Sequence, residues 1–97
     1  MSSVQDVISR VSRWGSENRL PHLVLGVAPR TTHKEDIITW VVFLDTCNVE
    51  PLGRYMVATF REEDGSVDQT KAYWSDDLRK AWAEFCQRAY PFQEWPR

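Results

Sequence analysis

The side chains that can act as nucleophiles, bases or soft metal ligands are few and widely spaced in this chain. The histidines are His22 and His33, and the cysteines are Cys47 and Cys86. His33 and Cys47 flank the apolar run 37–44 and form the one histidine–cysteine pair suited to nucleophilic chemistry. If that run is a straight strand, its eight residues span roughly 26 Å, which puts the pair far beyond hydrogen-bonding distance. The sequence therefore predicts no catalytic residues, and a small Cys47-dependent enzyme is kept as an alternative.

No metal, cofactor or phosphate site is predicted either. Zinc sites need four ligands at close spacing, such as C-x-x-C or H-x-x-x-H, and neither pattern occurs here. The carboxylates of Asp76 and Asp77 are interpreted as helix-capping groups, and those of Glu62, Glu63 and Asp64 as a solvated hairpin tip. The four glycines are too scattered to form a phosphate-binding loop.

Size and charge indicate one ordinary globular domain without a polyanion-binding half. The chain has 97 residues, of which 42% are hydrophobic and 27% charged, and a chain of this length builds a single core. The net charge is −2, from 12 basic and 14 acidic residues. Each half of the chain carries −1, because residues 1–50 contain 5 basic and 6 acidic residues and residues 51–97 contain 7 and 8. Such a balance argues against nucleic acid as the partner.

The sequence predicts a soluble, cytoplasmic protein. No apolar run approaches the roughly 18–20 residues that span a bilayer, and the N-terminal residues lack a cationic segment followed by an apolar one. The two cysteines are far apart in sequence and are expected to be free thiols in a reducing compartment.

The spacing of apolar residues predicts six elements. A helix is expected over 3–14, with Ser3 as its N-cap and Asp6 completing the cap, and a second helix is expected to open at Ser75, whose hydroxyl should accept a free amide. Between the helices, β-rich segments predict four strands. Their ranges are 22–28, 37–44, 54–61 and 66–74, with a loop over 45–53 and a hairpin turn over 62–65.

This order predicts an α+β fold, α-β-β-β-β-α, with an antiparallel meander sheet and the two helices packed on one face. A single domain covers residues 1–97, and residues 91–97 form an aromatic and proline-rich C-terminal tail. The apolar stripe of the second helix comprises Leu78, Ala81, Trp82, Phe85 and Ala89.

The central strand is apolar in both of its alternating sets of residues, which is unusual for an antiparallel sheet with one solvated face. The odd set contains Val41 and Phe43, and the even set contains Trp40 and Val42. If both helices cover one face, the other set faces outward and marks a contact surface, because large apolar patches on soluble proteins usually bind something. The alternative is that Phe92 and Trp95 of the tail fold over that face.

These observations favour a small non-enzymatic protein-binding module: an inhibitor, adaptor or accessory subunit of a larger assembly, with a protein partner or a second copy of the chain as its target. Small acidic inhibitors of nucleic-acid enzymes, including phage-encoded ones, share this size and composition. The predicted contact surface is the outward sheet face centred on Trp40, and its residues are Trp40, Tyr55, Tyr73, Glu62, Glu63, Asp64, Phe92 and Trp95. A nucleic-acid-binding module with a single-strand-binding sheet is the main alternative. Its candidate residues are Tyr55, Tyr73 and Arg54, with Arg30, Lys34 and Lys71.

Overall fold

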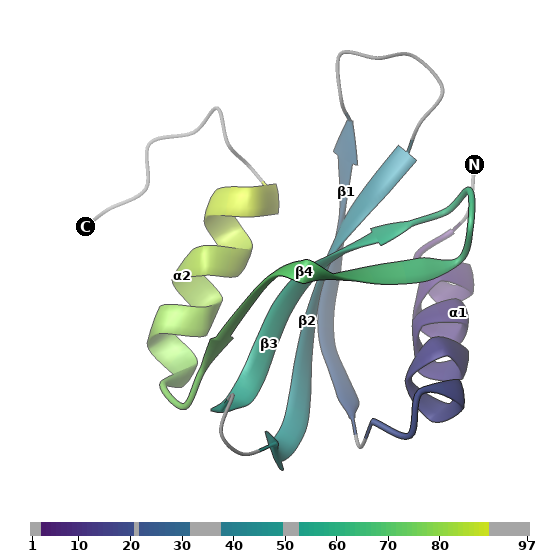
Figure 1. Cartoon of the computed structure of the whole chain (residues 1–97). Coiled ribbons are helices and arrows are strands. Elements are labelled where there is room, and N and C mark those ends of the chain that lie inside the picture. The colour runs from purple at the N-terminus through teal and green to yellow at the C-terminus, as the bar shows by residue number, and fades with distance from the viewer. Residues whose placement is uncertain (1–2, 21, 32–37, 50–52, 90–97) are drawn as a thin grey trace.

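The computed structural model describes residues 3–20, 22–31, 38–49 and 53–89 and has the predicted order of elements (Figure 1). The elements are α1 (Val4–Glu17), β1 (Leu23–Thr31), β2 (Ile38–Val49), β3 (Gly53–Arg61), β4 (Ser66–Ser75) and α2 (Leu78–Ala89). The four strands form one sheet in the order β1-β2-β3-β4, and each neighbouring pair is antiparallel. The α+β class and the meander topology are therefore confirmed.

The two helices, however, lie on opposite faces of the sheet, so the prediction that they share one face is wrong (Figure 1). Helix α1 packs against the even residues of β2, including Trp40 and Val42. Helix α2 packs against the odd residues, including Val41 and Phe43. Because each set is covered by its own helix, the two-sided apolar character of β2 is satisfied within one chain.

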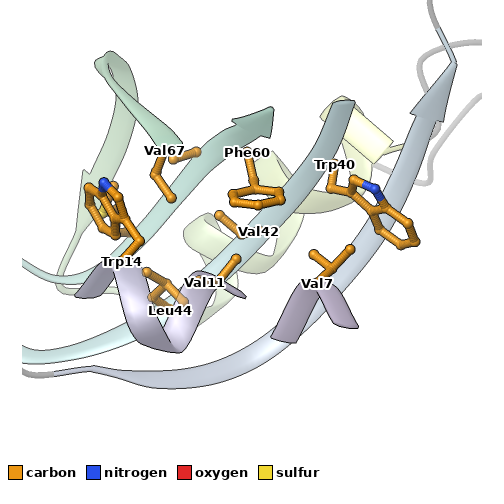
Figure 2. Close-up of a cluster of buried hydrophobic side chains, with 10 residues drawn as sticks. Val7, Val11, Trp14, Trp40, Val42, Leu44, Phe60 and Val67 are labelled. Atoms are coloured by element: carbon orange, nitrogen blue, oxygen red, sulfur yellow. The ribbon is translucent and has the colours of Figure 1, made fainter. Parts of the chain in front are cut away.

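The core on the α1 side is built from side chains of α1 and of β2, β3 and β4 (Figure 2). Val7, Val11 and Trp14 recur at the spacing that places them on one face of α1, and they point toward Leu44 and Phe60 of the sheet. The start of α1 is fixed by the predicted capping box. Its two bonds join the Asp6 amide to the Ser3 hydroxyl (3.2 Å) and the Ser3 amide to the Asp6 carboxylate (3.3 Å).

Strand β2 continues past the predicted boundary at residue 44, so the predicted loop over 45–53 is only partly correct. The register between β2 and β3 shifts between Asp45 and Val49, and Cys47 in this bulge has a φ of 59°. Buried Thr46 holds the bulge to β3 because its hydroxyl donates to the carbonyl oxygen of Arg54 at 2.7 Å. The longer strand thus places Asp45 and Cys47 at the end of the sheet.

Helix α2 is capped by Asp77, one residue before its first turn. The Asp77 carboxylate accepts the amides of Arg79 at 2.9 Å and Lys80 at 3.4 Å, and the Asp77 carbonyl oxygen accepts the Ala81 amide. The Ser75 hydroxyl accepts the amide of Asp77 itself, at 3.0 Å. The role of N-cap therefore belongs to Asp77, and Ser75 supports the turn that precedes the helix.

Replacing Asp77 with alanine is expected to lower the free energy of unfolding by about 1 kcal/mol, because two amides of the first turn lose their acceptor. Ser75→Ala should cost less, since its hydroxyl binds an amide outside the helix. Urea denaturation of both variants measures the difference. An equal or larger loss for Ser75→Ala would assign the cap to Ser75.

The end of α1 is joined to the start of β1 by a close contact between Gly15 and the imidazole of His22. A Cβ atom added to Gly15 would lie 2.5 Å from Nδ1 and Cε1 of His22. The ring is held in place because its Nδ1 lies 2.8 Å from the carbonyl oxygen of Leu20 and donates to it. Gly15 is thus required for the approach of this ring.

Gly15→Ala is expected to destabilise the fold by about 1–3 kcal/mol, although alanine normally stabilises a helix interior relative to glycine. Thermal or urea unfolding measures this loss. Ser9→Ala, at an exposed position of the same helix, is the matched control and should be close to neutral. His22→Ala should remove most of the penalty of Gly15→Ala in the double variant. Additive effects of the two substitutions would contradict the contact.

Candidate binding surface

Trp40 does not lie on an outward face, so the predicted surface centred on it is wrong. Its side chain is only 4% exposed and belongs to the core beneath α1. The indole Nε1 donates to a carboxylate oxygen of Glu62 at 2.8 Å, which satisfies its polar atom at the edge of that core. Trp40 therefore stabilises the fold, and a contact surface must be sought elsewhere.

The acidic hairpin tip, residues 62–64, is tied to α1 through the Glu62 backbone and to β2 through the Glu62 side chain. Arg10 of α1 donates to the carbonyl oxygen of Glu62 at 2.6 Å, while its guanidinium lies 5.2 Å from the centre of the Phe60 ring. Glu63 is exposed, and the Asp64 carboxylate accepts both the hydroxyl and the amide of Ser66. Only the outer part of this predicted site presents free charge, because Glu62 is engaged with Trp40.

Tyr55 and Tyr73 are half-buried against the core on the α2 side. The ring of Tyr55 meets that of Phe43 edge to face, with 6.1 Å between centroids. The structure thus brings these two predicted residues to the α2 side and places Glu62 on the other side of the sheet, against Trp40. The predicted residues Phe92 and Trp95, with the rest of 90–97, lie outside the described residues.

Four of the largest exposed apolar side chains among the described residues belong to α2 and to the edge strand β1. Trp82 is 53% exposed and Leu78, one turn earlier on α2, is 50% exposed. On β1, Leu23 is 59% and Leu25 is 44% exposed. We call these four residues the Trp82 ledge; among the described residues, Val4 of α1 is the other large apolar side chain with comparable exposure.

The strand register places Leu23 and Trp82 on the same side of the sheet. Leu23 pairs with Asp45, which has the same parity on β2 as Phe43, and Phe43 lies beneath Trp82 with 6.2 Å between ring centroids. The partner of Phe43 on β1 is Gly26, next to the bulged residue Leu25. Because Gly26 has no side chain, the sheet is open at this point.

Phe85 fills that opening and fixes Trp82. A Cβ atom on Gly26 would lie 3.4 Å from the tip of the Phe85 ring, so the ring rests on the glycine. Trp82 stacks on Phe85 at 5.6 Å between centroids, and both rings contact Phe43. The inner side of the Trp82 indole is therefore held by buried aromatic rings while its outer side faces solvent.

An ion pair borders this region at the end of the sheet. The guanidinium of Arg54 donates to both carboxylate oxygens of Asp45, at 2.9–3.2 Å, and lies 5.3 Å from the centre of the Tyr55 ring. These bonds lower the pKa of Asp45, and the Cys47 amide, which the same carboxylate accepts at 3.0 Å, adds to the effect. The pair thus holds the bulge of β2 and orients Arg54 over Tyr55.

Of the basic residues proposed for a single-strand-binding sheet, the structure describes the side chains of Arg54 and Lys71, which lie on different strands. Arg54 is paired with Asp45, and Arg61 of the same strand is paired with Asp68 at 3.3 Å. Lys71 lies on β4, exposed in the segment where the pairing with β3 is interrupted. The remaining candidates are Arg30, whose side chain is not described, and Lys34, which lies outside the described residues.

The residues considered for catalysis and metal binding are not brought together in the part of the chain that the structure describes. Cys47 is exposed in the bulge of β2, and His33 lies outside the described ranges. Cys86 is buried on α2, and burial raises the pKa of its thiol. Within the described residues, no three histidine, cysteine or carboxylate side chains are placed to hold a metal ion.

Sequence reasoning missed the exposed Trp82 because the residue fits the apolar stripe of α2. Helical spacing places it beside Ala81 and Phe85, and both of those are buried. Its position at the flank of the stripe, together with a glycine in the facing strand, is the signal that could have identified it. That signal becomes readable only when the register between β1 and β2 is known.

Asp45→Asn is expected to lower the free energy of unfolding at pH 7 by no more than about 1 kcal/mol, because Arg54 is largely exposed. The folded-state pKa of Asp45 lies below its unfolded value of about 3.9, so its contribution is present above that pH and is lost as the pH falls below it. Urea titrations at pH 7 and pH 3 measure the change. The difference in the free energy of unfolding between wild type and Asp45→Asn should be smaller at pH 3 than at pH 7. Arg54→Met should show the same dependence on pH. A difference that does not change with pH would contradict the ion pair.

Comparison with known proteins adds no assignment: no protein-family model, curated protein or solved structure matches this chain. Neither described helix is long and apolar enough to cross a bilayer. The functional argument therefore comes from the surface of the molecule.

Proposed function

We propose that the protein is a non-enzymatic protein-binding module, an inhibitor, adaptor or accessory subunit, whose contact surface is the Trp82 ledge. The observation that supports this proposal most directly is the half-exposed indole of Trp82, held against Phe85 and Phe43, with the exposed Leu78 one turn away on the same helix. Tryptophan is among the residues that most often dominate binding energy, because it buries a large area while few torsions become fixed.

The sheet edges favour contact through side chains over the addition of another strand. Edge strand β1 contains Pro29, which has no amide hydrogen to donate, and a bulge at Leu25 interrupts its register. The other edge, β4, has a register shift between the pairs Val57–Tyr73 and Thr59–Asp68. Since neither edge presents a long regular ladder, the partner is proposed to pack on the apolar ledge.

A photo-crosslinking amino acid at position 83, exposed on α2 one residue from Trp82, tests the proposal in cells of the natural source. The crosslinked protein is identified by mass spectrometry and purified, and its affinity is measured by calorimetry. Trp82→Ser should weaken binding at least about 30-fold, the equivalent of a hot spot of about 2 kcal/mol.

Val4→Ser is the matched control, because Val4 is 48% exposed on α1 and α1 covers the opposite face of the sheet. Its affinity should remain within about twofold of wild type, in line with the near-neutral effect of residues outside a hot spot. Circular dichroism verifies that both variants are folded. A folded Trp82→Ser variant that binds with unchanged affinity would remove the ledge from the interface.

A further inference from the structure

Next to Trp82 on α2 lies a positive charge that has no carboxylate partner among the described residues. Arg79 precedes Trp82 by three residues on α2, so the two side chains are neighbours on the helix surface. Among the described residues Arg79 makes no ion pair, whereas Arg54, Arg61 and Arg88 each pair with a carboxylate. A segment that complements the ledge should therefore combine an aromatic or aliphatic side chain with a nearby carboxylate.

The end of helix α2 is buried in the core on the α2 side of the sheet. Its last residue, Ala89, packs in the same cluster as Ala28 and Val41, which are partners across β1 and β2. The described chain therefore ends at Ala89 on the α2 side of the sheet, the side to which the register assigns Leu23. Five residues of strand separate Ala28 from Leu23, a distance of roughly 16 Å.

The sequence of residues 90–97 has the composition that the ledge requires. It contains Tyr90, Phe92 and Trp95 together with the carboxylate of Glu94. Prolines at 91 and 96 restrict the free chain and so reduce the entropy lost when it becomes ordered. Eight extended residues reach at most about 26–29 Å, enough to pass the whole ledge.

The lengths also match position by position if the segment runs back along α2. Phe92 is three residues beyond Ala89, roughly 10 Å of extended chain, and Trp82 is seven helical residues before Ala89, also roughly 10 Å. Glu94 is five residues beyond Ala89, roughly 16 Å, and Arg79 is ten helical residues before it, roughly 15 Å. Phe92 thus comes level with Trp82, and Glu94 with Arg79.

We propose that residues 90–97 dock within the same chain on the Trp82 ledge, with Phe92 against Trp82 and Glu94 beside Arg79, and that they compete there with the protein partner. The proposed docking is supported by the exposed Trp82, by the positive charge of Arg79 and by the length of the segment 90–97. The competition rests in addition on the proposed function, because it requires a partner that binds the same ledge.

Nuclear magnetic resonance of the full chain tests the docking. The Trp82 indole signal is assigned with Trp82→Phe, since the chain has five tryptophans. Nuclear Overhauser effects are expected between the Phe92 ring and the Trp82 indole, at unchanged relative intensity on dilution. Phe92→Ser and Glu94→Lys should each shift the indole signal and the methyl signals of Leu23.

Charge variants on α2 supply the matched control. Arg79→Glu should reproduce the shifts of Glu94→Lys, and the exchange of Arg79→Glu with Glu94→Arg should restore the wild-type spectrum. Lys80→Glu makes the same charge change one residue along, on another side of the helix, and should leave the Trp82 indole signal unchanged. Equal shifts for Arg79→Glu and Lys80→Glu would contradict the assigned ion pair.

Absence of these Overhauser effects overturns the docking, and their loss on dilution overturns it in favour of contact between two copies. The competition has its own readout. Phe92→Ser should bind the crosslinked partner about fivefold tighter or more, a change within the usual range of coupling between sites. Unchanged affinity overturns the competition while the Overhauser effects still decide the docking. If Trp82→Ser leaves the affinity unchanged, it is the proposed function that fails.

Discussion

The burial of β2 on both faces is the constraint on which the rest of the structure depends. Val41, Val42, Phe43 and Leu44 are consecutive, so their side chains point alternately to the two sides, and each is at most 2% exposed. Burying a side chain of this kind stabilises the folded state by about 1.5–3 kcal/mol. In so small a domain, exposing the apolar side chains of either face would therefore remove a large part of the stability. The sheet therefore needs one helix on each side, and α1 and α2 supply them.

The same constraint explains which parts of the fold could be predicted from the sequence. Local signals identified the elements: the Ser3–Asp6 capping box, the two helical stripes and the hairpin turn at Gly65, whose φ is 66°. The choice of face for each helix has no local signal, because a helical stripe fits either side of a sheet. Antiparallel sheets usually alternate apolar and polar residues along each strand. The sequence prediction assumed one covered face on this basis, and it therefore put both helices on one side and left Trp40 exposed. The two-sided apolar pattern of β2 required two covers. The sequence prediction sought the second cover in a partner or in the tail, whereas α2 supplies it.

The position of the Trp82 ledge follows from the widths of the layers. A helix with its side chains is about 10–12 Å across, whereas four strands about 4.8 Å apart form a wider surface, so one helix cannot cover a face completely. On the α1 side, Val67 belongs to the core. Val24 of β1, Trp74 of β4 and Leu20, between α1 and β1, pack against that core. On the α2 side, Leu23 of the edge strand β1 stays 59% exposed. Apolar side chains thus stay exposed at the edge of the sheet because one helix is narrower than four strands.

Rigidity distinguishes this ledge from an accidental gap in the packing. Phe43 and Phe85 are buried and contact the inner side of the Trp82 ring, so the orientation of the indole is set before any ligand arrives. A preorganised aromatic side chain loses little conformational freedom on binding, and more of its buried area then appears as affinity. Gly26 is central to this arrangement because a Cβ atom there would already touch the Phe85 ring at 3.4 Å, so a side chain larger than alanine would meet the ring and disturb the stack that supports Trp82. The absence of one side chain on an edge strand therefore connects the packing of the α2 core to the surface on which we expect the protein to act.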